Sequence, residues 1–487
     1  MSENDTKFYI DGAWLSPNTP KLHTVVNPAT EEAAGQISLG SGVDVDKAVA
    51  AARRAFLSYS QTSVKERIAL LERIAQSYET RKEDLARAMT LEMGTPISFS
   101  RTVQNVLGVG HFKQMAKTLE TYEFDEVVND TLIRREGIGV CGLITPWNWP
   151  INQVTTKLAA ALGAGCSVVL KPSELAPLSV IILAEILHAA GVPEGVFNLV
   201  NGDGPTVGEA ISSHPDIDMV SFTGSTRAGI LIAKSAADTV KRVTQELGGK
   251  SANIVLPDAD LSHAVPDGLI FAFKNAGQSC IAPSRMLVHR SQLNEAKEFA
   301  RQAAAKLKVG DPMDPSVAMG PLANQAQFEK VRRMIEIGIR EGATLICGGI
   351  ERPAGVHRGY FVRPTVFADV TPDMTIAREE IFGPVLSILT YDTEEEAIDI
   401  ANETVYGLAA YVQSTDLAHA QRVGAQLRAG RVYLGAHRFP ILDVPFGGYK
   451  RSGNGREMGR WGLEEYLETK ALIGYVRDPA RLPPPCW

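Results

Sequence analysis

Two residues of this chain, Cys280 and Glu246, are of the types that carry out covalent catalysis followed by hydrolysis. Cys280 lies in GQSCIAPS (277–284), where small neighbours let a substrate approach the sulfur. A buried structural cysteine more often lies in an apolar run, as Cys166 does. Glu246 directly precedes two glycines, which allow a sharp turn and leave room beside the carboxylate. The pair would suit acyl transfer to sulfur and then to water, with a purely structural cysteine as the alternative.

The composition is that of a globular protein and narrows the classes of partner. The chain has 487 residues, 45% of them hydrophobic, and a net charge of −7. This length suits about two to three domains, and the charge argues against nucleic acid or an anionic membrane as partner. The polar first residues and the lack of a long apolar stretch predict a cytoplasmic protein. Five scattered cysteines without CxxC spacing predict neither a metal site nor a disulfide framework.

The elements predicted before Glu246 describe an α/β domain with a parallel sheet. Helices are expected within residues 45–93 and a strand pair within 122–140. Further along, apolar strands and helices alternate, which is typical of βαβ units. The strands are expected at 140–144, 167–170, 196–200 and 219–222, and the helices at 157–162, 178–190, 206–213 and 229–237.

A second alternating block follows and predicts a second α/β domain. It begins with a strand at 252–256. The elements expected after it are a helix at 264–275, a strand at 285–288, and helices at 293–308 and 324–341. The boundary between the blocks is predicted at Gly248-Gly249. Glu246 and Cys280 then lie on opposite sides of it, in a cleft between two domains, where ligands commonly bind.

Two segments have features of a nucleotide-binding site. In residues 219–229 a strand leads into Gly224, Ser225 and a helix start, which offers free N–H groups to an anion. The GxxxxG spacing is neither the usual Rossmann fingerprint nor a P-loop, so a plain tight turn is the alternative. Lys171 and Glu174 follow a predicted strand at the sheet edge that binds nucleotides. Glu174 could accept both ribose hydroxyls and would repel a 2′-phosphate; a solvated charge pair is the alternative.

Seven motifs together resemble those of the NAD(P)-dependent aldehyde dehydrogenase superfamily, in the family's order and over essentially the whole chain. They are PWNWP (146–150), KPSE (171–174), FTGST (222–226), ELGGK (246–250), GQSC (277–280), EIFGP (380–384) and PFGGYK (445–450). The resemblance implies the hydrolytic, non-acylating type. It also implies two doubly wound parallel-sheet domains and a small β oligomerisation element. The expected NAD-binding domain comprises 1–118 and 141–248, the catalytic domain 249–450, the oligomerisation element 119–140 and 468–487, and the return segment 451–467.

The resemblance assigns catalytic roles to five residues. Cys280 resembles the nucleophile that forms a thiohemiacetal and then a thioester, and Glu246 resembles the base that activates the hydrolytic water. Asn148 resembles the side-chain donor that holds the oxyanion with the Cys280 N–H; such a donor is worth about two to three orders of magnitude in rate. Lys157 and Glu457 match a proton-relay pair, and the alternative that they only orient a loop stays open.

The cofactor implied by the resemblance is NAD, with NADP less favoured and no metal. Lys171, Ser173 and Glu174 resemble the clamp on the adenosine ribose. The other residues expected along the cofactor are Ile144, Trp147 and Gly204 in the groove, Gly224 and Ser225 at the pyrophosphate, Leu247 beside the nicotinamide, and Glu380 with Phe382 at the nicotinamide ribose.

The expected substrate is a small-molecule aldehyde, either a semialdehyde acid or an aromatic aldehyde. Candidate substrate residues are Trp149, Phe446 and Arg438, whose guanidinium could hold a carboxylate. A solvated surface position is the alternative for Arg438. The polar residues Asn152, Gln153 and Thr156 predict a pocket less apolar than simple alkyl aldehydes would need. Gly435, in the segment that shapes the substrate entrance, stands where many members of the family have Asn.

The hairpin expected at 122–137 and the tail strand at 471–475 would pair subunits into a homodimer or homotetramer, because protruding edge strands need partners. Two other functions compete with hydrolytic aldehyde oxidation. A CoA-acylating semialdehyde dehydrogenase is one, although such enzymes typically lack the carboxylate of Glu246. A catalytically idle binding protein with this fold is the other, and it would have no need to keep Cys280, Glu246 and Asn148 together.

Overall fold

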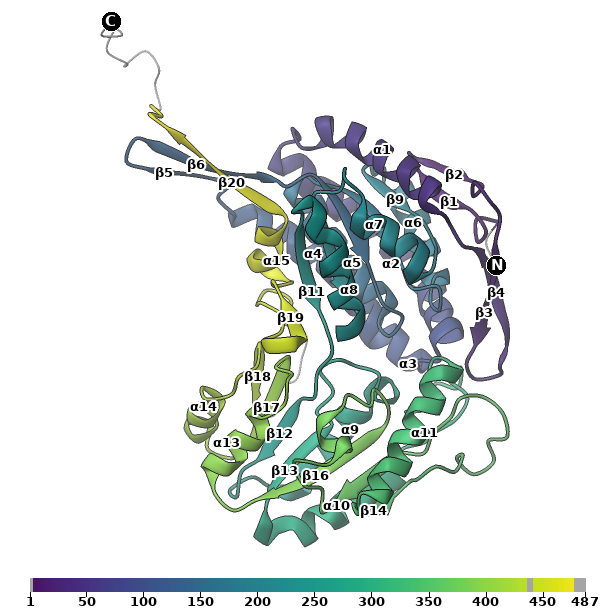
Figure 1. Ribbon diagram of the computed structural model, residues 1–487, viewed down its shortest axis with the longest axis vertical. Coiled ribbons are helices and arrows are strands. Elements are labelled where there is room, and N and C mark those ends of the chain that lie inside the picture. The colour runs from purple at the N-terminus through teal and green to yellow at the C-terminus, as the bar shows by residue number, and fades with distance from the viewer. Residues whose placement is uncertain (1–2, 436–440, 477–487) are drawn as a thin grey trace, which may run out of the picture.

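The computed structural model describes residues 3–435 and 441–476, and two large β-sheets organise them (Figure 1). One sheet has eight strands and the other seven, and helices pack against both. A three-stranded sheet and a two-stranded sheet complete the β structure of the described part of the chain. The α/β class and the two mainly parallel sheets predicted from the sequence are confirmed.

The eight-stranded sheet has the order β19-β11-β10-β7-β8-β9-β1-β2, and its strands β7 to β11 are parallel. Every residue of β7 to β10 is buried, as expected for strands covered on both faces. The strands are β1 (Phe8–Ile10), β2 (Ala13–Leu15), β7 (Val140–Ile144), β8 (Ser167–Lys171), β9 (Phe197–Leu199), β10 (Met219–Thr223), β11 (Arg242–Glu246) and β19 (Gly453–Asn454).

Helices cover both faces of this sheet with separate apolar cores. Residues of α2, α4, α5 and α6 form the core on one face, and residues of α1 and α8 contribute to the core on the other. The helices of this region are α1 (Gly42–Tyr59), α2 (Val64–Met93), α3 (Ile97–Phe99), α4 (Asn105–Thr121), α5 (Pro150–Ala164), α6 (Leu178–Ala189), α7 (Glu209–Ser213) and α8 (Thr226–Ala236). A two-stranded sheet of β3 (Leu22–Asn27) and β4 (Glu32–Ser38) lies near the N-terminus.

The seven-stranded sheet has the order β14-β15-β16-β13-β12-β17-β18 and is parallel except for β14. Its strands are β12 (Ala252–Val255), β13 (Arg285–His289), β14 (Thr344–Cys347), β15 (Thr365–Ala368), β16 (Val385–Tyr391), β17 (Ala409–Gln413) and β18 (Arg431–Leu434). Its helices are α9 (Leu261–Phe273), α10 (Leu293–Ala305), α11 (Gln325–Arg340), α12 (Thr375–Arg378), α13 (Glu394–Asn402) and α14 (Leu417–Gly424). Side chains of Asn324, Thr393 and Asp416 cap the starts of α11, α13 and α14.

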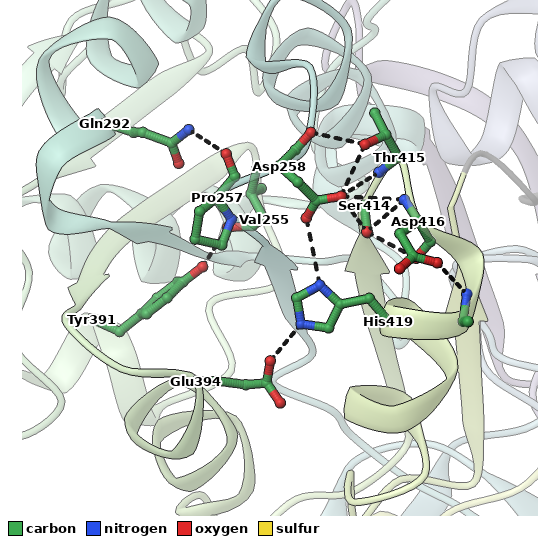
Figure 2. Close-up of polar contacts among 11 residues, drawn as sticks. Val255, Pro257, Asp258, Gln292, Tyr391, Glu394, Ser414, Thr415, Asp416 and His419 are labelled. Atoms are coloured by element: carbon green, nitrogen blue, oxygen red, sulfur yellow. Dashed lines mark hydrogen bonds and ion pairs between the residues drawn. The ribbon is translucent and has the colours of Figure 1, made fainter.

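A polar cluster fastens the loops at the carboxyl ends of β12 and β17 (Figure 2). Asp258 accepts hydrogen bonds from the hydroxyls of Ser414 and Thr415 and from the backbone N–H of Asp416. Burial opposes ionisation of this carboxylate, but these hydrogen bonds outweigh it and lower its pKa to about 2. His419 lies between Asp258 and Glu394. The cluster therefore fixes the loops at the carboxyl ends of these strands. Cys280 precedes β13, so it lies at the opposite ends of the strands.

The three-stranded sheet projects from the body of the molecule (Figure 1). It consists of β5 (Asp125–Val128), β6 (Thr131–Gly137) and β20 (Leu467–Ile473), and β20 pairs along the full length of β6. The tail strand is longer than predicted and begins four residues earlier, after the short helix α15 (Gly459–Glu465). The division of the chain into domains stays a prediction, since no boundary was tested.

Several predicted elements have different bounds in the structure, and some strands, β11 among them, were not predicted. The helix expected at 157–162 is the longer α5, which begins at Pro150 because proline suits a first helical turn, and ends at Gly165 with a φ of 85°. The sequence analysis did not predict β11, whose sequence RVTQE is polar. This strand pairs with β10 on one side and with the two-residue β19 on the other, so tertiary pairing rather than an apolar pattern defines it.

Candidate active site

Cys280 follows a loop whose backbone is held in an unusual conformation. Asn275, Ala276 and Gly277 have φ values of 56°, 54° and 73°, three consecutive residues in the left-handed region. Gly277 has no alternative, because a Cβ there would lie 2.1 Å from the carbonyl oxygen of Gly383. The Gln278 side chain accepts from the backbone N–H of Ala323 at 2.9 Å and fixes the end of the turn. This backbone strain lies in the loop that presents Cys280, the predicted nucleophile.

The start of α5 is tied to this loop by three hydrogen bonds. Asn148 Nδ2 donates to the carbonyl of Gln278 at 3.0 Å, and Asn275 Nδ2 donates to the carbonyl of Asn148 at 2.8 Å. Trp149 Nε1 donates to Ser279 Oγ at 2.9 Å. The structure thus places Asn148 and Trp149 against the loop that leads into Cys280. The role of Asn148 as an oxyanion donor stays a prediction, since its side-chain amide donates to a backbone carbonyl in the structure.

Glu246 ends β11 and contributes a buried carboxylate to the site. Its side chain is 4% exposed, and neither carboxylate oxygen has a hydrogen-bond partner in residues 3–435 and 441–476. Burial, reinforced by the nearby charge of Glu457, raises its pKa well above the usual range, and Lys157 opposes the shift. An orphaned buried carboxyl is costly unless a ligand or water meets it. Such a carboxylate is a stronger base than an exposed one.

Cys280 itself is partly exposed and lies against the glycine pair that follows Glu246. A Cβ on Gly249 would lie 2.4 Å from the Cys280 carbonyl oxygen, so only glycine allows this close approach. Burial raises the pKa of the Cys280 thiol, and the charges of Glu246, Glu380 and Glu457 raise it further. Burial is the larger of these causes, and the carboxylates around the sulfur add to it in opposing thiolate formation.

Lys157 and Glu457 form an ion pair next to Glu246. Lys157 is almost fully buried, with 1% of its side chain exposed, and Glu457 is 11% exposed. Glu457 also lines the cavity that contains Cys280, whereas Lys157 and Glu246 line a smaller cavity that Glu457 shares. The pair therefore lies between the two cavities, a position that is compatible with either of its predicted roles.

The cavity at Cys280 is walled mainly by apolar and aromatic side chains. The aromatic residues on its wall are Phe99, Trp149, Phe271, Tyr433 and Phe446. Of the predicted substrate residues, Trp149 and Phe446 line it, and Arg438 lies outside the described residues. Of the polar residues predicted on α5, Asn152 and Gln153 line it. The wall is more apolar than predicted from the sequence, because elements that are distant in sequence from α5 contribute most of its side chains.

Sequence reasoning missed several residues of this wall. Phe99 comes from α3 and Tyr433 from β18, and neither segment carried a motif. Arg431 was also missed: its guanidinium donates to the carbonyls of Val444 and Pro445 and lies 5.1 Å from the ring of Phe446. Arg431 therefore holds the segment that carries Phe446 in place. Hydrophobic residues in helices and strands look the same in sequence whether they line a pocket or fill a core.

A crevice for a nucleotide is expected where the first sheet changes winding direction. From β7 the chain continues to β8 on one side and returns to β10 on the other, so β7 marks the switch point at which such sheets bind nucleotides. At this edge the hydroxyls of Thr145 and Thr223 and the side-chain amide of Asn201 are buried without a partner in the described part of the chain. These orphaned polar atoms fit a polar ligand such as a dinucleotide.

The residues predicted to bind the adenosine ribose lie together at the end of β8. Lys171 Nζ donates to the carbonyls of Gly202 at 2.7 Å and Pro172 at 2.9 Å, and lies 3.4 Å from Glu174 Oε2. Burial lowers the pKa of Lys171, while Glu174 opposes the shift. The Glu174 side chain is 30% exposed, so its carboxylate stays accessible to a ligand.

The remaining predicted cofactor residues lie at the same edge or just before β16 of the seven-stranded sheet. Ser225 caps α8 by accepting from Ala228 N–H at 3.3 Å, directly after Gly224. Glu380 Oε1 accepts from Gly249 N–H at 2.9 Å, and the Trp147 and Phe382 rings meet edge to face at 5.6 Å. The others are placed as follows: Ile144 ends β7, Ser173 follows β8, Gly204 begins a π-helical turn before α7, and Leu247 follows β11. Their contacts with a cofactor stay predictions.

Comparisons with known proteins agree with this geometry. The family model of the aldehyde dehydrogenase family matches residues 14–472. A 3-succinoylsemialdehyde-pyridine dehydrogenase from a Pseudomonas species is 53% identical, with 96% of this chain and 98% of that protein covered. A cysteine-to-alanine variant of aldehyde dehydrogenase C from Pseudomonas syringae, solved with NAD+ and octanal, is 55% identical, with 98% of each chain covered and a TM-score of 0.97. An NAD+ complex of an aldehyde dehydrogenase from Bacillus cereus is 40% identical, with 96% of each chain covered and a TM-score of 0.93.

The chain therefore belongs to the aldehyde dehydrogenase family. It is an NAD-dependent oxidoreductase that acts on aldehydes. Among the residues that the structure describes, no helix is long and apolar enough to cross a membrane. No group of three or more His, Cys, Asp or Glu side chains in these residues could hold a metal ion.

Proposed function

We propose that the protein oxidises apolar or aromatic aldehydes to carboxylic acids through a thioester on Cys280. The observation that carries this proposal is the placement of Cys280 on the wall of an apolar cavity. The orphaned carboxyl of Glu246 lies close enough to raise the pKa of the Cys280 thiol. A thiol open to substrate and a carboxyl free to meet water are the two groups that oxidation followed by hydrolysis requires.

In the first step the Cys280 thiol loses its proton to solvent, and the sulfur attacks the aldehyde carbon to form a thiohemiacetal, whose oxygen carries the developing negative charge. Asn148 Nδ2 and the Cys280 backbone N–H are the donors proposed to hold this oxygen. NAD+, when bound, supplies the acceptor for the hydride that leaves the same carbon. Loss of hydride converts the thiohemiacetal into a thioester on Cys280.

In the second step Glu246 takes a proton from a water molecule, which attacks the thioester carbon. The carbon–sulfur bond breaks, the carboxylic acid leaves, and the sulfur recovers a proton. Lys157 and Glu457 lie next to Glu246 and offer a route by which its proton reaches the neighbouring cavity. The raised pKa of Glu246, caused mainly by burial, supports the role, since a higher pKa makes its carboxylate a stronger base.

The edge of the first sheet is proposed to hold NAD through the residues predicted from the sequence. Lys171 and Glu174 would contact the adenosine ribose, and the helix start at Gly224 and Ser225 would contact the pyrophosphate. Glu380 would contact the nicotinamide ribose, which brings the ring towards Cys280. The orphaned Thr145 and Thr223 hydroxyls at this edge support the assignment.

The substrate class follows from the cavity wall. Five aromatic side chains and further aliphatic ones favour a long alkyl or aromatic body on the aldehyde. The related proteins act on or bind a pyridine-bearing semialdehyde and octanal, and both are apolar or aromatic aldehydes. Arg438, the residue predicted to anchor a carboxylated semialdehyde, lies outside the described residues, so that substrate stays a prediction.

Replacement of the sulfur tests the proposal. Cys280→Ser should reduce NADH formation from octanal by at least about a hundredfold, because a hydroxyl is a far poorer nucleophile than a thiol. The matched control is Cys347→Ser, since Cys347 is a partly buried thiol on β14 outside the cavity, and it should keep near-wild-type activity. A Cys280→Ser enzyme with more than a few per cent of the wild-type rate would contradict the proposal.

The CoA-acylating alternative is tested on the same preparation. Addition of free CoA should leave the rate of octanoic acid formation unchanged, since the water-activating carboxylate of Glu246 is present. Formation of octanoyl-CoA faster than octanoic acid would favour the alternative.

A further inference from the structure

A small cavity lies at the amino ends of β12 and β17, and it shares no residue with the substrate cavity at Cys280. Its volume is about 20 Å³, which is room for one water-sized group. Lys250 and Ser251, which precede β12, line it together with Arg285 at the start of β13. The remaining wall comes from segments within residues 401–410 and 427–429.

Two side chains on this wall carry buried polar atoms that lack a partner. Lys250 is 2% exposed and Ser251 is 3% exposed. Lys250 Nζ and Ser251 Oγ have no hydrogen-bond partner in residues 3–435 and 441–476. An ammonium group can only donate, so the partner that Lys250 lacks is an acceptor. A buried cation without an acceptor is costly, and native proteins rarely leave one.

Arg285 adds a second buried positive charge to the same wall. Its guanidinium donates to the backbone carbonyls of Lys250, Ile400 and Ala401 at 3.0, 2.7 and 2.9 Å. These acceptors are neutral, so the contacts do not compensate the charge. Burial, reinforced by the charge of Arg285, lowers the pKa of Lys250 to about 7. Two buried cations therefore line one small cavity.

The main carboxylates that act on these cations have partners elsewhere. Glu380 accepts from Gly249 N–H at 2.9 Å, and Glu403 forms an ion pair with Arg378 at 3.0 Å. Neither carboxylate lines the cavity. The acceptor for Lys250 Nζ is then a bound water or a bound anion, and the uncompensated positive charge favours an anion. A volume of about 20 Å³ excludes phosphate, sulfate and organic acids.

The cavity lies close enough to the surface for a small ion to enter. Asn402, Thr404 and Tyr406 on its wall are only half-buried, and the intervening Glu403 and Val405 are exposed. An ion can therefore reach Lys250 through a movement of this short loop, without passing the substrate cavity.

We propose that this cavity is a binding site for a monatomic, halide-type anion such as chloride, which accepts hydrogen bonds from Lys250 Nζ and Ser251 Oγ. The ion satisfies the segment that directly follows Gly249. That glycine donates to Glu380, and a Cβ on it would lie 2.4 Å from the Cys280 carbonyl oxygen. The bound anion thus stabilises the support of the active site and takes no part in the oxidation itself.

Thermal unfolding of the full chain in a halide-free buffer tests the proposal. Sodium gluconate is replaced by sodium chloride, bromide or sulfate at millimolar concentrations and constant ionic strength. Chloride and bromide should raise the thermal midpoint saturably, by about 1–2 °C at ten times the half-saturating concentration, because an ion that binds only the folded state stabilises it. Sulfate and gluconate are too large for the cavity and should give no saturable shift.

Three variants assign the effect to the cavity. Lys250→Met removes the ammonium group and should abolish the halide shift. Ser251→Ala removes one donor and should raise the half-saturating chloride concentration by about three- to tenfold. The matched control is Lys241→Met, since burial also lowers the pKa of Lys241, to about 8, and its Nζ donates to the His214 carbonyl rather than facing this cavity. This control should keep the wild-type halide shift.

Crystals grown in sodium bromide give a direct measurement, which decides the case even if Lys250→Met does not fold. An anomalous difference peak within hydrogen-bond distance of Lys250 Nζ is the expected result. A cavity that holds only water in these crystals overturns the proposal. A thermal shift that sulfate reproduces, or that survives unchanged in Lys250→Met, overturns it as well.

Discussion

At the scale of single residues, the environment of Cys280 makes a specific statement about pH. Burial and the surrounding carboxylates raise the pKa of the thiol, so the reactive thiolate is a minor species at neutral pH and grows as pH rises. The pKa of Glu246 is raised as well, and its basic form also increases with pH. Both shifts act in the same direction, so activity should increase towards alkaline pH.

We expect kcat/KM for octanal to rise by about tenfold for each pH unit where the free thiol limits the reaction, between roughly pH 6 and 8. The measurement is a steady-state pH profile with saturating NAD, together with the rate at which iodoacetamide alkylates Cys280. A pH-independent profile over this range would show that the thiolate is already formed at neutral pH.

Glu174 carries a second prediction at this scale. Its accessible carboxylate beside Lys171 should repel the 2′-phosphate of NADP, so NAD should be preferred by about tenfold or more in kcat/KM. Glu174→Gln should narrow the preference, mainly through a lower KM for NADP. Equal efficiency with the two cofactors in the wild type would show that Glu174 does not face the ribose.

The sequence allowed these chemical residues to be predicted because each stands in a short motif with an unusual composition. Cys280 lies among small residues, and Glu246 lies before two glycines. The aromatic wall had no such signal, since Phe99, Phe271 and Tyr433 lie in ordinary apolar patterns on elements distant in sequence. Only the fold shows that they meet in one cavity.

At the scale of elements, the loop before Cys280 should be intolerant of any side chain at Gly277. A Cβ there would meet the Gly383 carbonyl at 2.1 Å in addition to adopting a φ of 73°. Gly277→Ala should therefore lower the thermal midpoint and reduce kcat together, because the overlap must displace the loop that carries the nucleophile.

The matched control for this prediction is Gly342→Ala. Gly342 has a φ of 92°, but no atom lies within 4 Å of the Cβ position. Gly342→Ala should lower the free energy of unfolding only by the strain of an alanine in the left-handed region, roughly 1 kcal/mol, and should keep its activity. Equal effects of the two substitutions on stability and on kcat would contradict the account of the Gly277 loop.

The elements that could be predicted from sequence are those whose pattern is local. The buried strands β7, β8 and β10 are short apolar runs, and their predicted bounds agree with the structure to within one residue. β11 could not be predicted, because its RVTQE sequence is polar and its pairing partners lie elsewhere in the chain. The left-handed turn at 275–277 was likewise hidden, because Ala276, between Asn275 and Gly277, is of a residue type that rarely adopts a positive φ.

At the scale of the whole molecule, the projecting three-stranded sheet leaves apolar side chains exposed. Ile473 is 83% exposed, Leu472 39% and Val128 46%, on strands that extend away from the body (Figure 1). Exposed strand edges and apolar residues of this kind favour subunit pairing. The homodimer or homotetramer predicted from the sequence stays a prediction, and this sheet is its expected contact.

Ile473→Asp should shift the protein towards smaller species, as measured by light scattering coupled to size-exclusion chromatography, because a charge would be buried in the contact. The control is Ile339→Asp, since Ile339 is 45% exposed on α11, which belongs with the other large sheet and lies far from the three-stranded sheet (Figure 1). A wild-type protein that is monomeric at micromolar concentration would contradict the predicted assembly.

The central claim, that oxidation passes through a thioester on Cys280 which Glu246 resolves, is tested most directly by trapping that thioester. Glu246→Gln enzyme mixed with octanal and NAD should release about one equivalent of NADH per active site in a burst and then turn over slowly, since only hydrolysis needs the base. Mass spectrometry of the quenched protein should find an octanoyl group on the peptide that contains Cys280, and none in the Cys280→Ser, Glu246→Gln double variant. If the Glu246→Gln enzyme lost both the burst and the steady-state turnover, and no acylated Cys280 peptide was found, the account would be contradicted.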